Sequence, residues 1–173
     1  MTSKKLLLYT IAGILFTSVT GTLAHFVYDW SGQNVLAGLF TPVSESTWEH
    51  MKLLFFPMLL YGFFTMFCLH KDFPCISHAY PLGILAGVFA IPVLFYTYSG
   101  ILGANYTVID ILIFYISVIF AFTVVYLKTK SCESGDADER EKRFLPWLAI
   151  LLLAACFIVF TIAPPSLGIF QVG

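Results

Sequence analysis

Charged residues are scarce in this chain. Only 11% of its 173 residues are charged and 59% are hydrophobic, whereas a soluble domain carries about 25% charged residues. The net charge is −1, so the chain has no basic surplus that would attract nucleic acid. This composition excludes an ordinary soluble domain and a nucleic-acid-binding protein.

The familiar catalytic and metal-binding signatures are missing as well. The chain has neither the His-Glu-x-x-His motif of zinc proteases nor the Glu-x-x-His motif of diiron bundles. It also lacks a phosphate-binding loop, a dinucleotide fingerprint and a Gly-x-Ser-x-Gly elbow. Its four cysteines form no Cys-x-x-Cys pair. Cys75 and Cys132 lie between apolar segments, on the side that the basic residues described below assign to the cytoplasm, and we expect both to be reduced.

Long apolar segments are what the chain has instead. A membrane-spanning helix needs roughly 20 mostly apolar residues, and its backbone must satisfy its own hydrogen bonds. We therefore predict an all-α polytopic membrane protein, in which a bundle of five transmembrane helices forms a single membrane domain over residues 1–173. The expected spans are Leu6–Tyr28, Glu49–Leu69, Tyr80–Tyr98, Val108–Leu127 and Phe144–Ile162.

The first span has an alternative interpretation. Lys4 and Lys5, the apolar run and the small residues around Ala24 also fit a cleavable signal peptide. The run is long enough to cross a bilayer and its polar residues share one face. These two features favour a helix that is retained.

The basic residues indicate the orientation of the bundle. When the spans are threaded alternately, the flanking lysines and arginines all fall on one side, and the other side has none. By the positive-inside rule this places the N-terminus in the cytoplasm and the C-terminus outside. The basic residues on the predicted cytoplasmic side are Lys4, Lys5, Lys71, Lys128, Lys130, Arg140, Lys142 and Arg143.

The first span carries a polar stripe. Gly13, Thr17, Gly21, His25 and Asp29 recur at every fourth position, so they share one slowly drifting helix face. Small residues at this spacing are typical of close helix packing in membranes. We therefore expect His25 and Asp29 to point into the bundle near its outer end, where Asp29 can orient the imidazole.

The second span begins with a cluster of ionisable residues. Glu45, Glu49 and Lys52 lie roughly on one helix face, and His50 lies about a quarter-turn away. A lysine at the bilayer centre costs on the order of 3 kcal/mol, and less near the interface. Lys52 therefore needs a carboxylate partner, for which Glu49 is the nearest candidate and Asp110 the second.

These groups form the predicted outer site. Crowded carboxylates raise one another's pKa unless a cation or proton is shared among them. Histidine and carboxylate side chains also supply nitrogen and oxygen ligands, so a divalent metal is possible, although no cofactor is firmly indicated. A purely structural role is the alternative, because acidic residues also stabilise helix N-termini. The candidate ligand- or cation-binding residues are His25, Asp29, Glu45, Glu49, His50, Lys52 and Asp110.

Two stretches, Leu23–Gly32 and Ser44–Pro57, resemble an uncharacterised family of small multi-pass membrane proteins of Clostridia-like Firmicutes. The family signature is similar to Asn/Ser-Glu-Ser-x-Trp-Glu-His-x-Lys, and here Ser44 takes the first position, where Asn is often found. The resemblance covers about the first 60 residues. It implies a bacterial cytoplasmic membrane protein of unknown function, and it brings no activity with it.

Three functions remain open on the sequence. The first is a transporter-like or small-ligand- or cation-binding protein, whose outward-facing polar pocket lies between the first, second and fourth spans. Five spans are few for a solitary transporter, so we expect a homodimer or a partner membrane subunit. The second is a membrane-embedded hydrolase or transferase, in which His25 and Asp29 act as base and orienter, or hold a metal with Glu49 and His50. The third is a structural or assembly subunit without chemistry.

Overall fold

The computed structural model describes residues 2–131 and 139–171, and for residues 2 and 139–143 only the backbone. The described chain is all-helical. Five of its helices are long and apolar enough to cross a membrane, as predicted. The elements are α1 (Thr2–Trp30), α2 (Val35–Gly38), α3 (Thr47–Leu69), α4 (Ile76–Leu102), α5 (Thr107–Ser131), α6 (Glu139–Ile162) and the 3-10 turn η1 (Gly168–Phe170).

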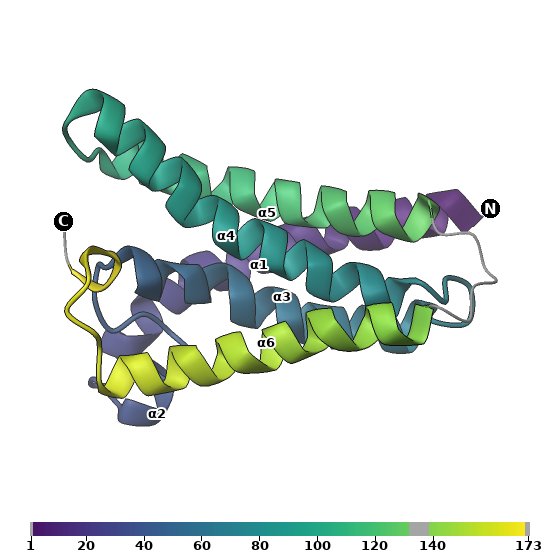
Figure 1. The fold of residues 1–173 in the computed structure, drawn as a ribbon, viewed down its shortest axis with the longest axis horizontal. Coiled ribbons are helices and arrows are strands. Elements are labelled where there is room, and N and C mark those ends of the chain that lie inside the picture. Colours follow the sequence, from purple (N-terminus) through teal and green to yellow (C-terminus); the bar gives the residue numbers. More distant parts are fainter. Residues whose placement is uncertain (1, 132–138, 172–173) are drawn as a thin grey trace.

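The long helices run alternately up and down, so the two chain ends lie at opposite ends of the bundle (Figure 1). At the N-terminal end, Lys5 forms a 2.7 Å ion pair with Asp72 in the α3–α4 connection. The Trp147 indole in the first half of α6 donates to the Ser77 carbonyl of α4 at 2.8 Å. The lysines that flank the described helices therefore share the N-terminal end, while the side chains of Arg140, Lys142 and Arg143 lie outside the described residues.

One expectation about the N-terminal end is wrong. Cys75, just before α4, is disulfide-bonded rather than reduced, and Cys132 lies outside the described residues. Disulfides are rare in the cytosol, whereas the lysines assign this same end to the cytoplasm. These two signals point in opposite directions, so the orientation of the bundle stays a prediction.

Helix α3 is the central helix, because it contacts α1, α4, α5 and α6. Its side chains Leu54, Phe55 and Met58 are fully buried. Helix α1 approaches it closely at Gly21, where an added Cβ would lie 2.5 Å from the Leu53 carbonyl oxygen. The small-residue stripe of α1 thus packs inside the bundle and sets α1 directly beside α3.

The α4–α5 pair diverges from the other helices at the C-terminal end of the bundle (Figure 1). The two helices pack tightly, since a Cβ added at Gly87 would lie 2.5 Å from the Ala121 Cβ. Pro92 lies inside α4 and removes one backbone donor, which allows the helix to change direction. The divergence carries the α4–α5 connection away from the ends of α1 and α3.

Candidate functional site

Two polar groups occupy the first turns of α3, and the first is a closed network around Lys52. The Lys52 side chain is fully buried, and its ammonium donates to the Gly38 carbonyl oxygen at 3.0 Å and to Glu49 Oε2 at 2.7 Å. It also donates to the Thr161 hydroxyl of α6. An ammonium has three N–H donors, so every donor of Lys52 is used inside the protein.

The Glu49 carboxylate completes this network. Its side chain is 5% exposed, and Oε2 also accepts the Val43 backbone N–H at 2.9 Å. The Thr161 hydroxyl lies 3.4 Å from Oε1. We call Glu49, Lys52, Thr161 and the Gly38 carbonyl the Lys52 lock. It ties α3 to α6 and to the α2 segment, and it leaves no charge or donor free for a ligand.

The second group is an open cluster of His25, Glu45 and His50, here called the His25 cluster. Glu45 Oε2 lies 3.5 Å from His25 Nε2 and 3.3 Å from His50 Nε2, and the two Nε2 atoms are 3.3 Å apart. The three residues come from α1, from the α2–α3 connection and from α3. The close approach of α1 to α3 at Gly21 places the two imidazoles together.

The start of α3 orients one of these imidazoles. Ser46 is the N-cap, and its hydroxyl accepts the Glu49 N–H. The Ser46 carbonyl oxygen lies 2.9 Å from His50 Nδ1. Because a carbonyl only accepts, Nδ1 carries the proton, and the lone pair of a neutral His50 is then on Nε2, facing Glu45 and His25.

The His25 cluster is accessible, in contrast to the Lys52 lock. Its side chains are 32% exposed for His25, 29% for His50 and 65% for Glu45. The three potential ligand atoms lie within 4.8 Å of one another, close enough to hold a metal ion. The arrangement can therefore take a cation from the surrounding solution without opening the fold.

Two of the predicted site residues lie apart from both groups. Asp29 is exposed, and its carboxylate makes no hydrogen bond or ion pair within the described chain. The expected pair of Asp29 with His25 is therefore not formed. Asp110 instead accepts a hydrogen bond from the Tyr98 hydroxyl of α4, and the ion-pair partner of Lys52 is Glu49.

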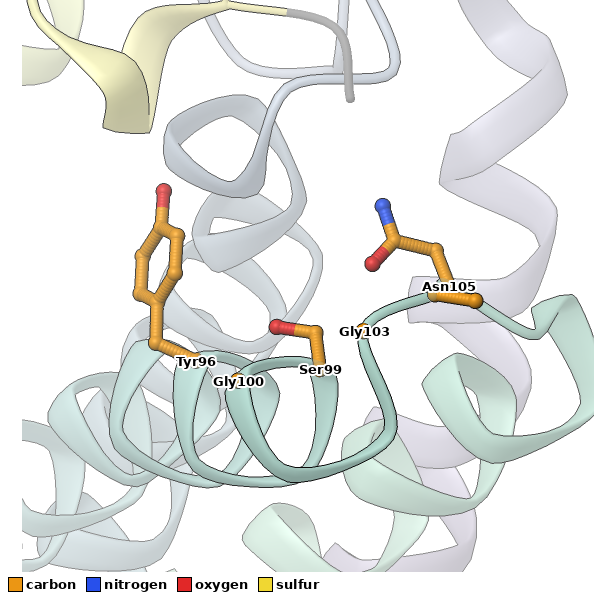
Figure 2. A pocket seen from close by; sticks show the side chains of 6 residues that line it. Tyr96, Ser99, Gly100, Gly103 and Asn105 are labelled. Carbon is orange, nitrogen blue, oxygen red and sulfur yellow. The ribbon is translucent and has the colours of Figure 1, made fainter.

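A pocket that the sequence did not indicate lies at the α4–α5 connection. Figure 2 shows the Tyr96 and Ser99 hydroxyls and the Asn105 amide projecting from this connection on one side. Gly100, Gly103 and Ala104 form the rest of the lining. The pocket contains no ionisable group other than a tyrosine and none of the predicted site residues, so it does not alter the assignment of the site.

A model for a family of unknown function (DUF6512) matches residues 1–173, and the chain belongs to this family. No curated protein and no solved structure matches the chain. The membership brings no activity, so the function must be argued from the geometry of the site.

Proposed function

We propose that this protein is a transporter-like or cation-binding multi-pass protein of a bacterial cytoplasmic membrane, and that it binds a cation at its outward-facing end through the His25 cluster. One observation carries the proposal. Two imidazole nitrogens and one carboxylate oxygen from three chain segments converge within 3.5 Å at a partly exposed position. The Glu45 oxygen and the His50 Nε2 lone pair repel one another unless a proton of His25 or a bound cation lies between them.

The Lys52 lock supports this assignment by exclusion. The charge of Lys52 is neutralised by Glu49 at 2.7 Å, so this pair holds no excess charge that would require a ligand. Glu45 has no lysine or arginine partner within the described chain. The carboxylate that binds the cation is therefore Glu45, whereas Glu49 has a structural role.

The lysines of the N-terminal end support an orientation in which the His25 cluster faces out. The large exposed apolar faces of α1 and α6 suit contact with lipid, or with a second copy or a partner membrane subunit. Such a partner would supply the additional spans that a transport path needs.

The enzyme alternative has less support. A base oriented by a carboxylate would need His25 and Asp29 in contact, and His25 contacts Glu45 and His50 instead. The metal-dependent form of the enzyme hypothesis uses Glu49 as a metal ligand, but the Glu49 carboxylate already accepts hydrogen bonds from Val43 and Lys52.

Thermal unfolding of the full-length protein in detergent tests the proposal. We expect at least one cation, in a series of alkali, alkaline-earth and transition-metal ions, to raise the Tm of the wild type. Glu45→Gln should abolish this shift, because it removes the charged ligand. The matched control is Asp29→Asn, which removes an exposed carboxylate one helical turn from His25 and should retain the shift. If no cation stabilises the protein, or if Glu45→Gln responds like the wild type, the proposal is wrong.

A further inference from the structure

Resting on the proposed cation site, we infer that the cation is a divalent transition metal of the zinc class. Its ligands are His25 Nε2, Glu45 Oε2 and His50 Nε2, and a fourth coordination position remains open to an exchangeable ligand. The inference stands on four features of the His25 cluster: its dimensions, its donor atoms, the orientation of the His50 imidazole and its exposure.

The dimensions fit a tetrahedral ion. Zinc holds nitrogen and oxygen ligands at about 2.0–2.2 Å, so two ligands of a tetrahedral site lie roughly 3.3–3.6 Å apart. The three ligand–ligand distances in the cluster are 3.3, 3.3 and 3.5 Å. An octahedral magnesium ion would draw adjacent ligands to about 3.0 Å. The cluster thus outlines one face of a zinc-sized tetrahedron.

The donor atoms select the same class of ion. Two of the three are imidazole nitrogens, which suit zinc, copper, nickel and iron, whereas calcium and magnesium prefer carboxylate, carbonyl and water oxygens. With neutral imidazoles and one carboxylate, the cluster carries a charge of −1. A divalent ion would leave the site at +1, which favours a water or an anion in the fourth position.

The imidazole of His50 is prepared for coordination. Its Nδ1 donates to the Ser46 carbonyl oxygen at 2.9 Å, and metal-ligating histidines typically donate their other ring N–H to such an acceptor. Because Ser46 is also the N-cap of α3, the carbonyl is held by the helix start itself. The nitrogen lone pair is therefore directed at the centre of the cluster before any ion arrives.

The fourth position lies on the accessible side. Structural zinc sites are closed by four protein ligands, whereas sites that exchange ligands have three and an open position. Glu45 is 65% exposed, so solvent reaches the ion next to this carboxylate. The site is consequently suited to a metal that enters, leaves or binds a further ligand, and not to a metal that only holds the fold together.

Metal titration of the full-length protein, purified without a histidine tag and stripped with chelator, tests the inference. We expect one Zn²⁺ per chain, and Co²⁺ as a spectroscopic probe should give the intense visible absorption of a tetrahedral ion. His25→Ala and His50→Ala should each weaken Zn²⁺ binding at least 100-fold. The matched control His70→Ala removes an exposed histidine at the other end of α3 and should bind like the wild type.

The outcomes separate this inference from the proposed function. If Ca²⁺, Mg²⁺ or an alkali ion stabilises the protein through Glu45 and Zn²⁺ does not bind, the zinc-class assignment is wrong while the cation site stands. If no cation binds, both fail. Zinc binding that survives His25→Ala and His50→Ala, or Co²⁺ spectra of an octahedral ion, also overturns the assignment.

Discussion

Glu49 and His50 are neighbours in the chain, yet they belong to groups of opposite character. Glu49 forms the Lys52 lock, in which Lys52 is fully buried and each of its donors has an acceptor. His50 belongs to the His25 cluster, which is partly exposed and whose carboxylate has no lysine or arginine partner in the described chain. Ionisable residues that share a helix near a membrane surface therefore need not belong to the same site. Because the Lys52 lock is buried and each donor of Lys52 is used, we assign it a structural role. Because the His25 cluster is accessible and its carboxylate has no lysine or arginine partner in the described chain, we propose that it binds the cation.

The largest effect is expected from breaking the lock. Lys52→Ala leaves the buried Glu49 carboxylate without its counter-ion, and removal of one partner from a buried pair costs about 3–5 kcal/mol. The free energy of unfolding, measured in detergent, should fall by this amount. The control Lys71→Ala removes an exposed lysine and should leave it nearly unchanged. A loss below about 1 kcal/mol for Lys52→Ala would show that the lock does not stabilise the fold.

An intermediate effect is expected where α1 meets α3. Gly21→Leu forces a side chain against the Leu53 carbonyl and Phe114, and such overpacking costs typically about 1–3 kcal/mol. It should also move His25 from His50 and so weaken cation binding.

The control for Gly21→Leu is Gly87→Leu, which overpacks α4 against Ala121 on α5. It should destabilise the protein to a similar degree without changing the cation affinity. Equal affinity losses in the two variants, measured by titration, would contradict the role of the α1–α3 contact in building the cluster.

The smallest effect on stability is expected from a cysteine substitution that tests on which side of the membrane the His25 cluster lies. Ala104→Cys changes an exposed residue of the α4–α5 connection, at the C-terminal end of the bundle, and should not alter stability measurably. In intact cells an impermeant maleimide should label this thiol and not the one introduced by Lys71→Cys. The reverse labelling pattern would place the His25 cluster in the cytoplasm and would agree with the disulfide bond of Cys75.

The sequence predicted most of the residues near the site, but it did not predict that they divide into the Lys52 lock and the His25 cluster. The spacing of Glu49 and Lys52 predicted their ion pair. The partner of His25 could not be predicted in the same way. Asp29 is one turn away on the same helix, yet the contact goes to Glu45 and His50 from other segments. Such a contact depends on how two helices pack, and local spacing does not report that.

The amino-acid sequence by itself determined the five apolar helices, because a chain in lipid must satisfy its backbone within each helix. It also determined that a lysine within a span must have an acidic partner. Only the tertiary structure decided which acid is free. Thr161 and the Gly38 carbonyl come from distant segments and close the shell around Lys52. The packing of α1 on α3 brings His25 to His50, and the hydroxyl of Tyr98 on α4 bonds Asp110. The physical reason is that the hydrogen-bond partners and the solvent exposure of a side chain depend on its neighbours in space, and these neighbours come from segments far apart in the chain.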